Sequence, residues 1–160
     1  MMATTMVNRQ HGVAAVELAV LLFPLLTILF GITEFGRVMY QYNTIAKAAR
    51  DAARLLSTQA PTDPDYQTLV NEATCTAVYG NPGCTGVPLL PNLAASMISI
   101  CDPVRCPATH AAVTTGTGVV NLVTVTIGGS SAPYTFTSFA SVAVPSFSFA
   151  AVSVTMRQVL

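Results

Sequence analysis

Residues 12–33 read GVAAVELAVLLFPLLTILFGIT, and this stretch decides the fold. The part from Leu18 to Ile32 carries no charged residue. Together with the residues from Val13 onward, it reaches the length of about 20 residues that a helix needs to cross a bilayer. Glu17 is the one acid in the segment, and a carboxylate near a hydrocarbon core is costly unless it has a function. We therefore predict a transmembrane helix over residues 13–33.

The composition suits a membrane anchor joined to one modest domain. The chain has 160 residues, of which 52% are hydrophobic and only 9% are charged. Seven basic residues balance seven acidic ones, so the charge indicates neither a nucleic-acid partner nor a strongly basic protein partner. Beyond Pro61 the chain is rich in Thr, Ser, Ala, Val, Gly and Pro, which favours short strands and turns.

The helix is expected to continue past the membrane. Apolar residues recur at spacings of four and three along one helical face, at Val38, Tyr42, Ile45, Ala49, Ala52 and Leu56. This pattern predicts an amphipathic helix over residues 34–57. The whole rod, from Val13 to about Ser57, would be roughly 68 Å long at 1.5 Å per residue.

Pro24 lies inside the apolar half of the predicted helix. A proline in a helix interior removes one hydrogen bond and produces a kink, although membrane helices tolerate prolines better than soluble ones. Two interpretations stay open: a plain kink, or a weak point that unwinds when the helix leaves the bilayer.

Residues 58–160 predict a small α+β head. Asp63 and Pro64 form an N-cap and first-turn pair, so a short helix should follow them to about Val78. Apolar patterns predict strands over 95–101, 119–127 and 147–156, the last with a change of phase near 150–151 that indicates a bulge. The predicted fold class is therefore α+β, with a long N-terminal helix covered by a small antiparallel sheet, as in pilins.

All four cysteines follow the apolar stretch: Cys75, Cys84, Cys101 and Cys106. An even number on one side of a membrane segment is typical of disulfides in an oxidising compartment. Of the three possible pairings we favour the sequence-local one, Cys75–Cys84 and Cys101–Cys106, because turn-forming residues separate the partners. Zinc is the alternative, but only Cys101 and Cys106 approach the usual ligand spacing.

No catalytic constellation stands out in the sequence. His11 precedes the apolar stretch and His110 has no second histidine near it, so no histidine-based triad or metal site is indicated. No glycine-rich phosphate loop precedes a helix. We expect neither an enzyme nor a bound cofactor or metal.

Residues 1–12 read as a short leader. They hold one fixed positive charge, Arg9, and no acid. The residues that follow the apolar stretch, from Thr33 to Arg37, do not form the small-residue site of an ordinary signal peptidase, so the stretch should remain as an anchor. A leader that ends in Gly12, followed by four small or apolar residues and Glu17, resembles the class III leader of type IV pilins and pseudopilins.

That resemblance implies a processing event and a pairing. A prepilin peptidase would cut after Gly12 on the cytoplasmic face and make Val13 the new N-terminus. Glu17 would then pair with the free amine of a neighbouring subunit. A buried carboxylate needs such a partner or becomes neutral, so this role is physically reasonable. The alternative for Glu17 is an interfacial acid near a helix N-terminus.

The wider pattern is similar to the TadE-like family of tight-adherence pilus systems. The shared features are Gly12, Glu17, Pro24, the Gly31–Gly36 segment with Glu34, and the closing residues 48–54. The resemblance implies a membrane-anchored pseudopilin or minor pilin that helps to assemble or initiate the pilus. Its implied partners are the prepilin peptidase, other pilins and the assembly platform. The alternatives are the main filament subunit and a single-pass envelope protein that never polymerises.

The orientation in the membrane rests on two opposing signals. Arg9 precedes the predicted span, whereas four basic residues follow it: Arg37, Lys47, Arg50 and Arg54. The positive-inside rule alone would leave the head in the cytoplasm. The cysteines and the leader both favour a head outside the cytoplasmic membrane, and we give them more weight. In the assembled pilus the protein would be extracellular.

Overall fold

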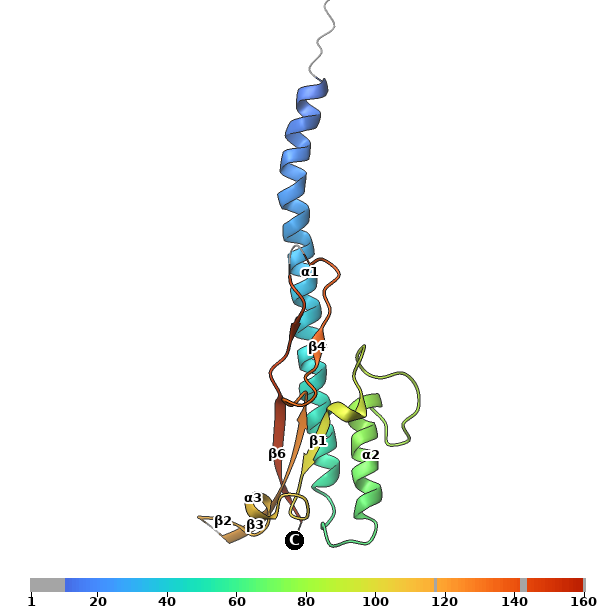
Figure 1. Cartoon of the computed structure of the whole chain (residues 1–160), viewed down its shortest axis with the longest axis vertical. Helices are drawn as coiled ribbons and strands as arrows, with labels where there is room; N and C mark the ends of the chain where they lie inside the picture. The colour runs from blue at the N-terminus through green and yellow to red at the C-terminus, as the bar shows by residue number, and fades with distance from the viewer. Residues whose placement is uncertain (1–10, 117, 142–143, 160) are drawn as a thin grey trace, which may run out of the picture.

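One long helix, α1 (His11–Leu56), runs through the whole molecule, and the head lies along its C-terminal half (Figure 1). The computed structural model describes residues 11–116, 118–141 and 144–159, so residues 1–10 of the predicted leader lie outside the described residues. The helix has 46 residues and continues through Pro24. The prediction of a single rod followed by an antiparallel head is confirmed.

The C-terminal half of α1 forms the centre of the core. It packs against a second helix, α2 (Tyr66–Tyr79), and against the strands β3 (Gly118–Ile127) and β6 (Val152–Gln158). Four residues of the predicted apolar face of this helix are buried: Ile45, Ala49, Ala52 and Leu56. The other two differ, since Val38 is half-buried and Tyr42 is 44% exposed.

The helix α2 begins two residues later than the sequence indicated. The backbone N–H of Asp65 donates to Asp63 Oδ1 at 3.0 Å, so Asp63 stabilises a turn ahead of the helix and is not its N-cap. Asp65 occupies the N-cap position. One face of α2 is buried against the core and includes Leu69, Val70, Ala73 and Ala77.

The sheet is antiparallel, with β3 at its centre. It pairs with β1 (Ile98–Cys101) on one side and with β6 on the other, while β2 (Val113–Thr115) pairs with the beginning of β3. Val123, Val125 and Ile127 face the core. Val119 is 51% exposed because this end of β3 pairs only with β2.

Two strand predictions need correction. Residues 95–97 form a short 3₁₀ helix, η1 (Ala95–Met97), so the first strand begins only at Ile98. The predicted strand over 147–156 is divided between β5 (Phe147–Ser148) and β6. The change of phase near 150–151 is therefore the point where the chain moves from one sheet to another, and not a bulge.

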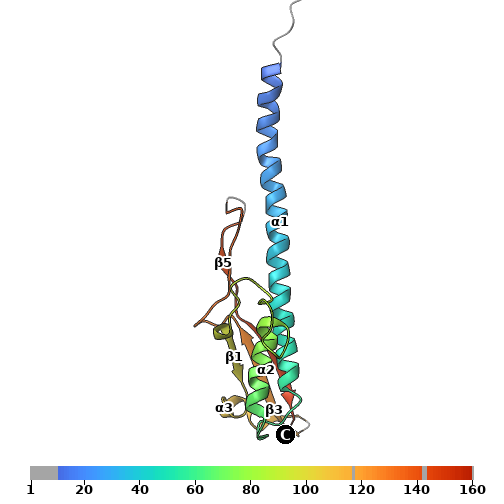
Figure 2. The same ribbon diagram turned by 90° about the vertical axis from the view of Figure 1, so that its right-hand side faces the viewer.

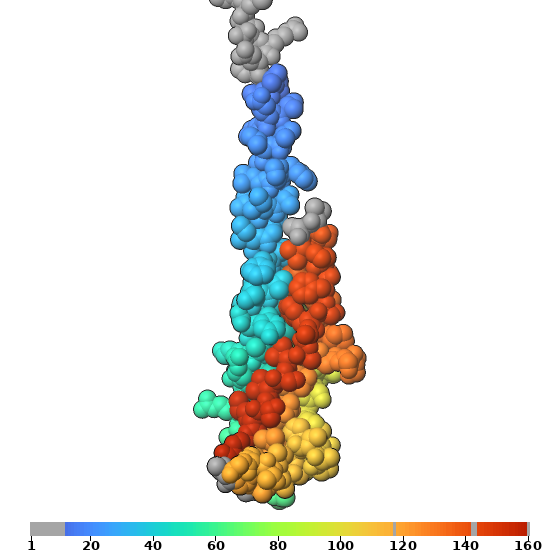
Figure 3. All heavy atoms as spheres, turned by 90° about the vertical axis from the view of Figure 1, so that its left-hand side faces the viewer, coloured from blue at the N-terminus to red at the C-terminus, as the bar shows by residue number. Residues whose placement is uncertain are grey.

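The strands β4 (Thr135–Phe136) and β5 form a separate hairpin that extends along α1 toward the apolar end (Figures 2 and 3). Aromatic rings hold its base: Tyr134 stacks on Phe149 with ring centroids 5.7 Å apart, and Phe136 lies 5.5 Å from Phe147. The Tyr134 hydroxyl also donates to Gln41 Oε1 at 3.2 Å on α1. A short helix, α3 (Pro107–His110), completes the head.

Candidate functional site

Among the described residues, only the end of the C-terminal hairpin lies beside the N-terminal half of α1, and the rest of this half is uncovered (Figures 1 and 3). We call residues 12–30 the bare half of α1. From Gly12 to Phe30 every residue is exposed except Thr27, which is half-buried. Within α1 an 18-residue window reaches a mean hydropathy of 2.5, and none of that window is buried. Such a large apolar surface is too costly to leave in water, so this helix suits a single-pass membrane anchor.

The predicted processing and pairing residues lie together at the free end of this half. Gly12, Val13 and Glu17 all belong to α1 and are exposed. Within the described part of the chain, Glu17 forms no ion pair or side-chain hydrogen bond, and it lies on the bare half, far from the head.

Pro24 lies in the middle of the bare half, and α1 remains helical around it. Polar side chains nearby are satisfied within the helix. The hydroxyl of Thr27 donates to the carbonyl oxygen of Phe23 at 2.9 Å, and that of Thr33 donates to the carbonyl oxygen of Leu29 at 2.9 Å. Both hydroxyls are hydrogen-bonded without water, and polar groups in a hydrocarbon environment must be satisfied within the protein in this way.

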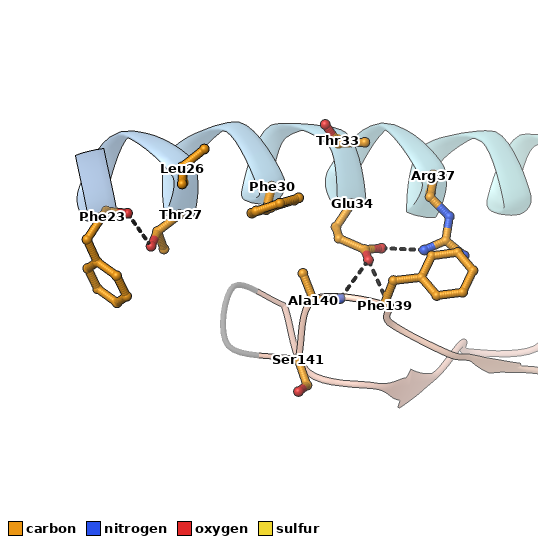
Figure 4. Close-up of a pocket in the computed structure, with 10 residues that line it drawn as sticks. All are labelled: Phe23, Leu26, Thr27, Phe30, Thr33, Glu34, Arg37, Phe139, Ala140 and Ser141. Carbon is orange, nitrogen blue, oxygen red and sulfur yellow. Dashed lines mark hydrogen bonds and ion pairs between the residues drawn. The ribbon is translucent and has the colours of Figure 1, made fainter. Parts of the chain in front are cut away.

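Glu34 joins the helix to the head, a role that the sequence did not indicate. It is 3% exposed. Its Oε1 accepts the backbone N–H groups of Phe139 at 2.7 Å and Ala140 at 3.0 Å, and its Oε2 accepts from Arg37 Nη1 at 2.7 Å (Figure 4). Burial by itself raises the pKa of Glu34, but the two backbone donors and Arg37 outweigh it and hold that pKa below its usual 4.5.

Arg37 reinforces the same junction. Its guanidinium carbon lies 4.0 Å from the ring centroid of Phe139 and 5.3 Å from that of Phe136. The spacing of Glu34 and Arg37 by three residues on one helix is the signal that the sequence offered for their ion pair. Nothing local in the sequence indicated the loop residues that complete the arrangement.

A groove of about 590 Å³ lies between α1 and the end of the β4–β5 hairpin. Its helix wall includes Phe23, Leu26 and Phe30, and its other wall includes Phe139 and Ala140 (Figure 4). Glu34 and Arg37 lie at the end of the groove nearer the head. Their charged groups are engaged with each other and with the loop, so the groove offers an apolar surface and not an acid–base centre.

Both disulfides have the sequence-local pairing that we favoured. Cys75 is joined to Cys84 with Cα atoms 4.8 Å apart, and Cys101 is joined to Cys106 with Cα atoms 5.4 Å apart. The possible metal ligands Cys101, Cys106 and His110 have donor atoms within 4.8 Å of one another. Because the two sulfur atoms are bonded to each other, this set leaves one donor for a metal, and the zinc alternative does not fit.

Comparison with known families gives one match. Residues 12–54 match the family model described as TadE-like protein. The matched range contains Gly12, Glu17, Pro24 and Glu34, and it lies within α1, so the resemblance seen in the sequence is confirmed for the helix. No curated protein and no solved structure matches the chain.

Proposed function

We propose that this chain, with its TadE-like helix over residues 12–54, is a membrane-anchored pseudopilin or minor pilin of a tight-adherence pilus. It is cut after Gly12 by a prepilin peptidase and is held in the cytoplasmic membrane by residues 13–33. Its head lies outside, where it takes part in assembly or initiation of the pilus together with other pilins and the assembly platform. It contributes packing surfaces and no catalysis.

The bare half of α1 is the observation that carries this proposal. A fully exposed apolar helix that is continuous with a folded head needs a covering of lipid or of neighbouring helices. An assembling pilin subunit has each of these coverings in turn. The two disulfides support a head in an oxidising compartment.

Glu17 gives the proposal its most specific element. In a bundle of such helices its carboxylate would be buried, and a buried carboxylate is stable only with a cation beside it or a proton on it. Cleavage after Gly12 creates a positively charged amine at Val13. The peptidase would thus make the partner that Glu17 needs in a neighbouring subunit, which links processing to assembly.

The test compares Glu17→Ala with Asp51→Ala, a change of an exposed acid on the head half of α1. Both variants should be inserted and processed. The Glu17 variant should be depleted roughly tenfold or more from sheared pili relative to the membrane fraction, because the buried amine loses its counter-ion. Equal incorporation of the two variants would contradict the pairing.

The abundance of the protein in sheared pili separates the minor role from that of the main filament subunit. A minor component should be rare relative to the dominant pilin. A protein that never polymerises should be absent from the pili and should keep its leader.

A further inference from the structure

We propose that the tip of the β4–β5 hairpin, residues 137–141 and 144–146, is a second membrane contact that enters the leaflet on the head's side of the bilayer. This inference rests on the proposed role of α1 as the membrane span. The position, composition and hydrogen bonding of the tip support it independently of one another.

The position of the tip follows from the length of the span. Phe139, Ala140 and Ser141 line the same groove as Phe23 and Phe30, so the tip lies beside the second half of the predicted span (Figures 2 and 4). If the bilayer ended before the tip, near Leu26, the helix from Val13 would cover only about 21 Å. The hydrocarbon core is about 30 Å thick, so the tip and the outer part of the span share the same depth.

The composition of the hairpin suits that depth. Between Arg105 and Arg157 the chain contains no Asp, Glu, Lys or Arg. At the tip, Phe139 is 87% exposed, whereas Tyr134 and Phe136, nearer the base of the hairpin, are buried. An exposed phenylalanine beside a bare apolar helix forms one continuous apolar surface, which a bilayer around α1 would cover.

Four backbone N–H groups of the tip have acceptors within the protein. The N–H groups of Phe139 and Ala140 donate to Glu34, that of Ser138 donates to Ser146 Oγ at 3.1 Å, and that of Val144 donates to the carbonyl oxygen of Ala140 at 3.0 Å. A non-helical segment at membrane depth is tolerated only when such groups are satisfied within the protein. In an ordinary exposed loop the N–H groups of Phe139 and Ala140 would donate to water, whereas here they donate to Glu34.

The charged pair marks the level of the interface. Arg37 neutralises Glu34 and lies against the ring of Phe139, with its side chain 29% exposed. Arginine and aromatic side chains are typical of the boundary between hydrocarbon and headgroups. A protein partner for the tip would have to lie inside the membrane beside α1, whereas lipid is already present there, so lipid is the occupant that the geometry favours.

The absence of tryptophan from the chain makes a direct test possible. Phe139→Trp, Phe23→Trp and Val87→Trp each introduce a single tryptophan, whose fluorescence can be excited selectively at long wavelength. We name these variants the tip probe, the span probe and the loop probe. The loop probe is the matched control, because Val87 is 83% exposed in a head loop. The processed full chain of each variant is placed in phosphatidylcholine vesicles, with and without lipids brominated at defined acyl positions. Intact disulfides, shown by the lack of reactive thiols, confirm that each variant is folded.

The proposal expects the tip probe to emit at a shorter wavelength than the loop probe and to be quenched by brominated lipid. Bromine near the headgroup should quench it more strongly than bromine near the end of the acyl chain. The loop probe should not be quenched. If the tip probe behaves like the loop probe while the span probe is quenched, the tip lies in water and the inference is wrong. If the span probe is not quenched either, α1 does not span the bilayer and the anchoring role itself fails.

Dilution distinguishes lipid from a second copy of the chain. Burial of the tip probe by lipid should be independent of the ratio of protein to lipid. A blue shift that disappears on dilution would mean that another subunit covers the tip, and this result would also overturn the inference.

Discussion

Glu17 and Glu34 lie on one helix and within one family match, yet their surroundings are opposite. Glu17 is exposed on the bare half of α1. Glu34 is buried and accepts two backbone N–H groups from a loop more than a hundred residues further along the chain, with sequence separations of 105 and 106. In our proposal Glu17 pairs with a neighbouring subunit, whereas Glu34 binds the hairpin to α1 within the same chain.

The pKa of Glu34 leads to a prediction about pH. A carboxyl whose pKa is lowered in the folded state stabilises that state above the unfolded pKa, and this contribution is lost as the pH falls through the lowered value. The tip should therefore stay bound to α1 at neutral pH and loosen only below pH 4.5, the usual pKa of the group. The amide proton shifts of Phe139 and Ala140, followed by NMR in micelles, measure this transition.

Two variants control that titration. Glu34→Gln keeps an oxygen acceptor but cannot titrate, so the shifts should no longer change with acid. Glu34→Ala removes the acceptor and should loosen the tip at every pH. A midpoint at or above pH 4.5 in the unmodified protein would contradict the assigned contacts.

The residues that sequence could identify are those with local signals. The cysteine pairs follow from the turns between them and are confirmed. The roles predicted for Gly12, Glu17 and Pro24 from the pattern of one helix stay predictions. Asp102 is an example of what could not be found. It is fully buried and accepts from the Tyr66 hydroxyl at 3.1 Å, a contact across 36 residues that no local periodicity encodes.

At the scale of elements, α1 is a single helix with two different environments. Its length and its division into an apolar and an amphipathic half could be predicted, because both depend on composition and on a period of 3.6 residues. How far each residue of the apolar face is buried could not be predicted. The sheet and α2 cover α1 around Ile45–Leu56, whereas the described residues cover the preceding turns of α1 less completely, so Tyr42 remains partly exposed.

The small residues of α1 allow its close packing against the head. Ala49, Ala52 and Ala53 have no exposed surface. Ala52→Leu should therefore overfill the core and lower the free energy of unfolding of the head by about 1–3 kcal/mol. Arg50→Leu, at an exposed neighbouring position, should change it by less than about 0.5 kcal/mol. Urea unfolding in micelles compares the two, and equal stabilities would contradict the packing.

The strand predictions failed where one local pattern has two structural explanations. A shift of phase in an alternating segment is produced equally by a bulge and by a chain that leaves one sheet for another. The choice at 150–151 depends on β4, which pairs with β5 through only two residue pairs. A strand of that length has no periodicity to detect.

At the scale of the whole molecule, the distribution of apolar surface accounts for the shape. The apolar residues of the head and of the C-terminal half of α1 cover one another, and the apolar residues of the other half remain exposed over the length of a bilayer. The hairpin crosses the boundary between these regions. The sequence could locate both regions, but not the hairpin, because its path depends on Glu34 and on aromatic contacts that only the fold brings together.

The orientation of the molecule in the membrane stays a prediction. Arg37, one of the basic residues that argue for a cytoplasmic head, is engaged by Glu34 and Phe139 at the end of the span. The disulfides argue for an oxidising compartment on the head side. Processing on the cytoplasmic face would fix the N-terminus there and decide the question.

The most direct test of the proposal is therefore the intact mass of the protein extracted from membranes of cells that express a matching prepilin peptidase. The proposal predicts a chain that begins at Val13, with both disulfides formed. A chain that still begins at Met1 or Met2 would contradict it, and would leave the spacing of Gly12 and Glu17 without a function in processing.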